Sequence, residues 1–204
     1  MEIIFDFDGT VADSLGSLIK ILGDLAPEFG FKPITQYEID IYREEGAREA
    51  LKKLKVSLFK LPKIIQRCQE EQTKKIADIK IIDGLVDVLH TLKAQGFVLG
   101  ILTSNSKENV EKFLVKNEID IFSYIYSEKN LFGKEKIIKH LLKERGLKVG
   151  DVIYVGDEVR DIEACKKAGV KIVAVSWGFN SKNILEKYEP DWLIDEPEGL
   201  LDII

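Results

Sequence analysis

The chain has 204 residues, which suits one domain with a sizeable insertion or two small domains. Its 30 basic and 35 acidic residues give a net charge of −5, which weighs against nucleic acid or an anionic membrane as a partner. No apolar run approaches the roughly 20 residues that span a bilayer, and no basic signal segment precedes the first apolar run. Because Cys68 and Cys165 lie far apart, we expect free thiols and a cytoplasmic protein.

Short apolar segments, typical of buried strands, alternate with helical patterns along most of the chain. The expected strands are residues 2–7, 97–102, 123–127, 151–155, 171–176 and 192–194. The helical patterns between and after them are residues 84–95, 106–117, 134–145, 159–168 and 181–188. This alternation predicts an α/β fold, a Rossmann-like parallel sheet with helices on both faces.

One long stretch, residues 14–80, breaks the alternation. It shows helical patterns at 14–26, 36–44, 46–55 and 58–78 and no convincing strand. The sequence therefore predicts a helical insertion after the first strand. We expect a core of residues 1–13 and 81–204, with residues 14–80 as a second, helical unit. Its segment 63–80 is rich in Lys, Gln and Glu, which is typical of a solvated helix face.

Two carboxylates one residue apart, Asp6 and Asp8, follow the first apolar strand and precede Gly9. Side chains at i and i+2 of a strand point to the same side, at the end of the sheet where open α/β proteins bind ligands. Two adjacent negative charges at the end of a buried strand cost folding free energy, because they are desolvated and repel each other. A bound cation or a catalytic role would explain why they are present. The alternative is a chain that simply leaves the core into a polar turn.

Polar residues also follow later strands. Thr103 ends the second strand just before a helix start, which suits either an anion site or a helix cap. Asp157 and Asp161 follow the fourth strand with a spacing of four residues, which would place both on one side of a helix start. Lys134 begins a helix, where a cation is unfavourable unless an anion lies nearby.

Taken together, these motifs resemble those of the haloacid dehalogenase superfamily of phosphotransferases, in the same order along the chain. The segments that carry the resemblance are Asp6-Phe7-Asp8-Gly9-Thr10, Thr103-Ser104-Asn105, Lys134, and Gly156-Asp157 with Asp161. The insertion is similar to the helical C1-type cap of phosphoglycolate phosphatase-like members. An acid at position 8 favours phosphoryl chemistry, because dehalogenating relatives lack it.

The resemblance implies a Mg²⁺-dependent phosphatase acting on a small organic phosphate monoester. Mg²⁺ would be held by the Asp6 carboxylate, the Asp8 backbone carbonyl and Asp157. Asp6 would be the nucleophile that forms an aspartyl phosphate, and Asp8 the general acid and base. Lys134 would balance charge, and Asp161 would position Lys134 or a metal-bound water. The implied substrate-binding residues are Gly9, Thr10, Thr103, Ser104 and Asn105.

Two arginines of the insertion, Arg43 and Arg48, flank Gly46 between two helical patterns. Arginine suits a carboxylate or a second phosphate, and glycine permits close backbone approach. They are therefore candidate substrate-binding residues for a second anionic group. The alternative is that both arginines form surface ion pairs with neighbouring glutamates.

Three other functions are alternatives to the phosphatase interpretation. A phosphomutase of the β-phosphoglucomutase type shares the same core residues, and isomer formation in place of phosphate release would identify it. A phosphoaccepting receiver-type module also uses an aspartate, Mg²⁺ and a lysine, but its nucleophile lies on a later strand and it has no long helical insertion. An inactive binding protein with this fold is disfavoured by the complete set of motifs.

Overall fold

The computed structural model describes residues 1–32, 35–53, 59–127 and 133–204, apart from the side chains of residues 38 and 47–52. Within these ranges six parallel strands form one sheet in the order β3-β2-β1-β4-β5-β6. The strands are β1 (Glu2–Phe5), β2 (Val98–Thr103), β3 (Tyr124–Ser127), β4 (Val152–Gly156), β5 (Lys171–Val175) and β6 (Trp192–Ile194). The predicted α/β fold with a parallel sheet is confirmed.

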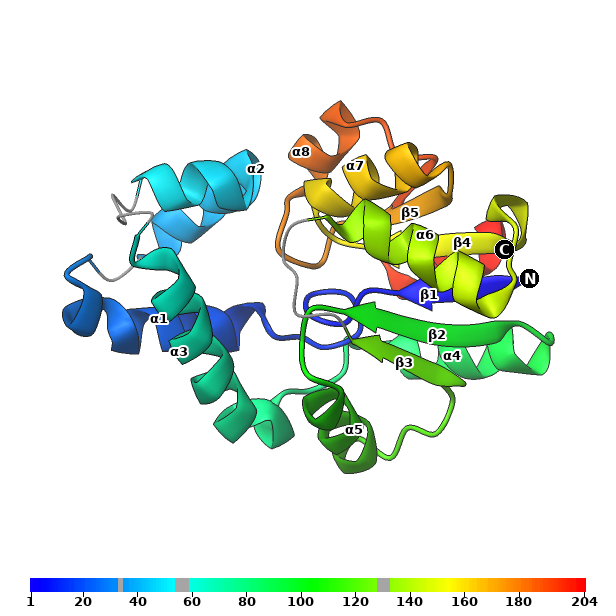
Figure 1. The fold of residues 1–204 in the computed structure, drawn as a ribbon, viewed down its shortest axis with the longest axis horizontal. Coiled ribbons are helices and arrows are strands. Elements are labelled where there is room, and N and C mark those ends of the chain that lie inside the picture. The colour runs from blue at the N-terminus through cyan, green and yellow to red at the C-terminus, as the bar shows by residue number, and fades with distance from the viewer. Residues whose placement is uncertain (33–34, 54–58, 128–132) are drawn as a thin grey trace.

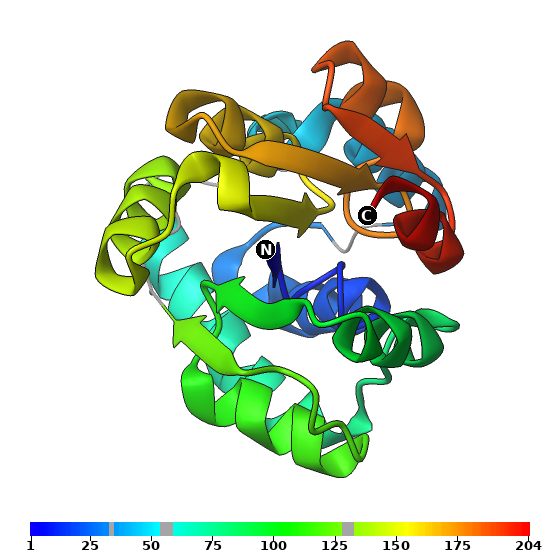
Figure 2. The ribbon, with the colours of Figure 1, turned by 90° about the vertical axis from the view of Figure 1, so that its right-hand side faces the viewer.

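Helices cover both faces of this sheet (Figure 2). One face carries α4 (Leu85–Ala94), α5 (Lys107–Lys116) and the short α9 (Leu200–Ile203); the other carries α6 (Lys134–Arg145), α7 (Val159–Ala168) and α8 (Lys182–Lys187). Buried side chains alternate between the two faces: Ile3 and Phe5 belong to one apolar cluster and Ile4 to the other. None of the described helices is both long and apolar enough to cross a membrane.

The direction of strand addition reverses between β1 and β4. The chain builds β2 and β3 on one side of β1, then crosses over to add β4, β5 and β6 on the other side. Ligands of open α/β sheets bind at the carboxyl ends of the strands that flank such a reversal. The register pairs Phe5 with Val155, so the residues that follow β1 and β4 leave the sheet next to each other.

Residues 14–80 are called the insertion below, and their described parts lie beside the carboxyl ends of the strands (Figure 1). The insertion contains α1 (Leu15–Phe29), α2 (Gln36–Lys53), α3 (Leu61–Lys75) and the short 3₁₀ helix η1 (Ile76–Asp78). Helices α1 and α3 pack through a cluster of their own, formed by Ile21, Leu25, Phe29, Ile64 and Cys68. The two connections to the core run side by side: the Asp13 N–H donates to the Lys80 carbonyl at 2.9 Å.

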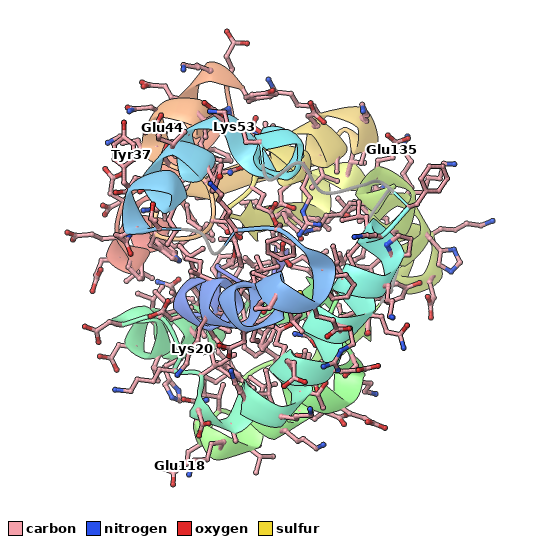
Figure 3. The ribbon with its side chains drawn as sticks, turned by 90° about the vertical axis from the view of Figure 1, so that its left-hand side faces the viewer. Lys20, Tyr37, Glu44, Lys53, Glu118 and Glu135 are labelled. Atoms are coloured by element: carbon pink, nitrogen blue, oxygen red, sulfur yellow. The ribbon has the colours of Figure 1, made fainter. Side chains whose placement is uncertain are left out.

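The chain departs from the sequence expectation at the first strand. This strand, expected over residues 2–7, ends at Phe5, because the Phe7 carbonyl accepts the N–H groups of Val11 and Ala12 in a tight turn. The separate helical patterns at 36–44 and 46–55 agree with α2, which is described to Lys53 and consists of two helical segments that meet at a kink at Gly46 (φ 78°, ψ 165°). The kinked helix rests on α8, as Figure 3 shows for the region of Glu44 and Lys53.

Gly100 in β2 leaves room for the ring of Tyr124, its neighbour in β3. A Cβ at Gly100 would lie 2.1 Å from Tyr124 Cζ. The ring cannot shift freely, because its hydroxyl donates to Glu2 at 2.9 Å and the Arg145 guanidinium lies 3.8 Å over its face. Gly100→Ala should therefore lower the free energy of unfolding by about 1–3 kcal/mol, measured by denaturant titration.

The matched control is Gly23→Ala in α1, where a Cβ meets nothing within 4 Å. Alanine is favoured over glycine in a helix by about 1 kcal/mol, so this variant should be as stable as the wild type or more so. Equal stability of the two variants would show that the packing of Tyr124 does not depend on Gly100.

Candidate active site

Three buried carboxylates meet where β1 and β4 end. Asp6, Asp157 and Asp161 each present one oxygen, and these oxygens all lie within 4.8 Å of one another. Asp6 still belongs to the sheet, since its N–H donates to the Val155 carbonyl at 2.8 Å. Asp157 follows β4 directly, and Asp161 lies in the first turn of α7. The reversal point of the sheet therefore concentrates negative charge in a buried place.

Lys134 links two of these carboxylates. Its Nζ lies 2.6 Å from Asp6 Oδ2 and 2.5 Å from Asp161 Oδ1. The lysine begins α6 after Gly133, and its Nζ lies 5.1 Å from the centroid of the Tyr154 ring. Burial favours the neutral amine, but the charges of Asp161 and Asp6 outweigh burial and raise the pKa of Lys134. The cation that is unfavourable at a helix start is thus held by two anions from other elements.

The charges of the site do not balance. Burial raises the pKa of Asp6 and of Glu158, and it holds the pKa of Asp157 well above its ordinary value, with neighbouring carboxylates adding to each shift. Two cations, Lys134 and Arg160, lie among these carboxylates. Arg160 Nη2 lies 2.5 Å from Glu158 Oε1. Four carboxylates (Asp6, Asp157, Glu158 and Asp161) against two cations leave a formal excess of two negative charges when all are ionised.

Asp157 is held in a cradle of small residues. The Thr10 hydroxyl donates to Asp157 Oδ1 at 2.7 Å, and the Phe179 N–H donates to Oδ2 at 2.7 Å. A Cβ on Gly9 or on Gly178 would lie 2.3 Å or 2.2 Å from the same Oδ2, so both positions require glycine. Sequence reasoning identified Gly9 and Thr10 but missed the loop 176–180. The only signal for that loop was its position after the fifth strand.

Asp8 lies in a different environment, between two amide groups. Asn105 Nδ2 donates to Asp8 Oδ2 at 3.0 Å, and Gln72 Nε2 of the insertion donates to Oδ1 at 2.6 Å. Burial raises the pKa of the Asp8 carboxyl, while these two hydrogen bonds act in the opposite direction. Gln72 was also missed, because its segment was interpreted as a solvated helix face. That interpretation is wrong for this residue, which points toward the core.

The end of β2 forms an ordered polar turn. The Thr103 hydroxyl oxygen accepts the Asn105 N–H at 2.9 Å, and both residues are buried. Asn105 Oδ1 accepts the Ser106 N–H at 2.8 Å and Asn109 Nδ2 at 2.9 Å. Ser106 is the cap of α5, since its hydroxyl accepts the Asn109 N–H. Asn105 is therefore free to direct its amide nitrogen at Asp8, with Ser104 beside it in the same turn.

Arg43 lies at the contact between α2 and the core. Its Nη2 donates to the Ser176 carbonyl at 3.1 Å, at the start of the 176–180 loop, and its Nε is buried with no hydrogen-bond partner among the described residues. Of the alternative partners expected for the arginines, Glu45 pairs with Lys53 and Glu44 accepts from Asn183, while the side chain of Glu49 lies outside the described residues. The side chain of Arg48 lies outside the described residues.

The fold is of the α/β class, and the cluster of carboxylates with Lys134 lies at the reversal of strand order. The family model of haloacid dehalogenase-like hydrolases matches residues 3–175, so the chain belongs to this family. The predicted family and enzyme class, a hydrolase of the phosphatase type, are confirmed.

Named relatives and solved structures agree with the family. A phosphoglycolate phosphatase of Synechococcus elongatus is 34% identical over 203 residues, 99% of this chain and 96% of the relative. A pyrophosphatase of Bacillus cereus is 30% identical over 126 residues, 60% of this chain and 58% of the relative. The crystal structure of a predicted phosphatase from Clostridium acetobutylicum shares the fold, with a TM-score of 0.85, 20% identity, and coverage of 99% of this chain and 96% of that chain.

Replacing Asp157 by asparagine should stabilise the metal-free protein at neutral pH. No cation contacts Asp157 among the described residues, and its pKa in the folded state lies above the unfolded value. The carboxylate therefore destabilises the fold increasingly as pH rises above about 4. We expect Asp157→Asn to raise the melting temperature in EDTA at pH 7, and the gain to fade as pH falls toward 4.

Asp202→Asn, at an exposed position in α9, is the control and should change the free energy of unfolding by less than about 0.5 kcal/mol. A melting temperature of Asp157→Asn below that of the wild type at pH 7 in EDTA would contradict the proposed charge excess.

Proposed function

We propose that this hydrolase is a Mg²⁺-dependent phosphatase that acts through a phosphorylated Asp6, with 2-phosphoglycolate as its leading candidate substrate. The observation that carries the proposal is the contrast between its two first-strand acids. Asp6 lies against Lys134 among buried carboxylates, and Asp8 lies apart from them between two amides. This contrast supports Asp6 as the nucleophile and Asp8 as the group that transfers a proton.

The donor set suits a hard divalent cation. The ligands that Mg²⁺ prefers are oxygens, and the site offers buried carboxylates with an excess of negative charge. The proposed ligands are the side chains of Asp6 and Asp157 and the backbone carbonyl of Asp8. Asp161 is already engaged, accepting from Lys134 and from the Glu158 N–H, which suits a positioning role. Bound Mg²⁺ would lower the repulsion between an anionic nucleophile and an anionic phosphate ester.

In the first step, an Asp6 carboxylate oxygen forms a bond to phosphorus while the ester P–O bond breaks. The leaving oxygen takes the proton of Asp8 and departs as the alcohol. Burial raises the pKa of Asp8, which is the direction that a proton donor in this step requires. Lys134 neutralises charge on Asp6 and on the transferring phosphoryl group.

In the second step, water attacks the phosphorus of phospho-Asp6. Asp8, now ionised, takes a proton from this water, the Asp6–phosphorus bond breaks, and inorganic phosphate forms. One water is consumed for each ester cleaved, and both acids return to their starting state. We assign Gly9, Thr10, Thr103, Ser104 and Asn105, in the turn after β1 and the turn after β2, to the surroundings of the phosphoryl oxygens.

The substrate proposal rests on the relative from Synechococcus elongatus, which is named for phosphoglycolate and spans nearly the whole chain. This substrate carries a carboxylate besides its phosphate. The buried, unpartnered Nε of Arg43 supports this arginine as the ligand of that carboxylate, with Arg48 as a second candidate. Residues 14–80 would then act as a cap that recognises the leaving group of the substrate. Buried free thiols at Cys68 and Cys165 support the proposed cytoplasmic location.

The test is phosphate release from 2-phosphoglycolate, pyrophosphate, a sugar phosphate and an aryl phosphate, each with Mg²⁺ and with EDTA. We expect release only with Mg²⁺, with the highest kcat/KM for 2-phosphoglycolate. No release from any of these compounds with Mg²⁺ would overturn the phosphatase proposal. Isomerisation of the sugar phosphate without phosphate release would indicate a mutase instead.

Arg43→Ala should raise KM for 2-phosphoglycolate about tenfold or more, because a hydrogen bond to a charged group contributes about 1.5–3 kcal/mol. KM for the aryl phosphate should not change. Arg67→Ala in α3 is the matched control, since Arg67 pairs with Glu70 on the outer surface of the insertion. Unchanged KM for 2-phosphoglycolate in Arg43→Ala would assign Arg43 to the contact with Ser176 alone.

A further inference from the structure

Gln72 is a side chain of the insertion that contacts a proposed catalytic acid of the core. It lies in the last turn of α3, and its Nε2 donates to Asp8 Oδ1 at 2.6 Å. We propose that Gln72 is a positioning residue, which holds the Asp8 carboxyl in the orientation that proton transfer to the leaving oxygen requires. This inference rests on the proposed phosphatase function and adds a residue to it.

The hydrogen bonds around Asp8 fix its side chain from both sides. Gln72 engages one oxygen and Asn105 engages the other, at 3.0 Å. Asn105 cannot turn its amide away, because its own Oδ1 accepts from Ser106 N–H and from Asn109 Nδ2. Among the residues that the structure describes, no core group besides Asp8 holds the Gln72 amide, so the placement of Gln72 depends on the position of α3.

A second contact holds α3 at this place. Thr73, next to Gln72, accepts a hydrogen bond from Asn109 Nδ2 at 2.9 Å and donates to the Gln69 carbonyl at 2.8 Å. Asn109 therefore contacts both Thr73 of the insertion and Asn105 of the core. Because of this shared partner, the same docking of α3 against α5 that seats the insertion also brings Gln72 to Asp8.

The consequence concerns the efficiency of proton transfer. A general acid must lie within hydrogen-bond reach of the leaving oxygen, and small misplacements of reacting groups are costly in rate. With Gln72 removed, Asp8 keeps one amide partner and gains freedom to rotate. The loss of rate should be large for alkyl esters, because their leaving oxygen needs the proton. It should be small for aryl esters, because their leaving oxygen departs as a stable anion.

The experiment compares kcat/KM for an alkyl and an aryl phosphate with Mg²⁺, since kcat/KM covers the steps through the first phosphoryl transfer. Gln72→Met keeps the length of the side chain and removes the amide. We expect kcat/KM to fall about tenfold with the alkyl ester and to change little with the aryl ester. A tenfold loss is a fraction of the roughly 10²–10⁴ in rate that general acid catalysis contributes. Gln72→Asn keeps the amide but shortens its reach, and should shift the alkyl-to-aryl ratio in the same direction.

Two controls separate positioning from docking. Thr73→Val removes the neighbouring contact with Asn109 but keeps the amide of Gln72, and should lower the alkyl-to-aryl ratio less than Gln72→Met does. Gln66→Met alters a glutamine of the same helix that donates to Glu70 on the exposed surface, and should change neither ester. Melting temperatures of all variants report whether α3 remains folded.

A double-mutant cycle identifies the residue through which Gln72 acts. In an Asp8→Asn background, Gln72→Met should cause no further loss with the alkyl ester. Equal losses for both esters in Gln72→Met, or a full additional loss in the Asp8→Asn background, would overturn the positioning role. Absence of phosphate release from the wild-type protein would instead overturn the phosphatase proposal itself, and the role of Gln72 with it.

Discussion

The burial of several carboxylates at one point of the sheet is the constraint on which the rest of the structure depends. Asp6 and Asp157 leave adjacent parallel strands at the reversal of strand order, where the register brings them together. Desolvated like charges raise one another's pKa and destabilise the fold. Lys134 reduces this cost for Asp6 and Asp161, and the remaining excess of negative charge matches a divalent cation. The proposed Mg²⁺ would offset the free-energy cost of burying these carboxylates together.

Local features of the core serve this arrangement. The turn after β1 has Gly9 in the left-handed region, at φ 79°, so that the chain can pass close to Asp157. The loop after β5 contributes Gly178 and the Phe179 N–H to the same carboxylate. The neutral amides around Asp8 come instead from α3 and from the turn after β2. The molecule thus separates a charged half of the site from a half governed by hydrogen bonds to neutral groups.

The sequence predicted the parts of this arrangement that strand ends determine. Short apolar segments located the six strands, and parallel strands place their carboxyl ends at one edge, which is why Asp6 and Asp157 could be grouped from their positions at strand ends. Gln72 could not be found in this way, because its contact with Asp8 spans 64 positions and depends on how α3 docks. Arg43 was a candidate from the sequence, but its contact with the core could not be predicted, because its partner is the backbone carbonyl of Ser176.

The most direct test of the account is to identify the residue that carries the phosphoryl group. Asp8→Asn with an aryl phosphate and Mg²⁺ should accumulate the intermediate, because the first step then needs no acid while the second lacks its base. Acid quenching, borohydride reduction of the acyl phosphate and peptide mass spectrometry locate the modified aspartate. The account predicts reduction of Asp6 to homoserine. An acyl phosphate on Asp157 or Asp161, or phosphate release without any acyl phosphate, would contradict it.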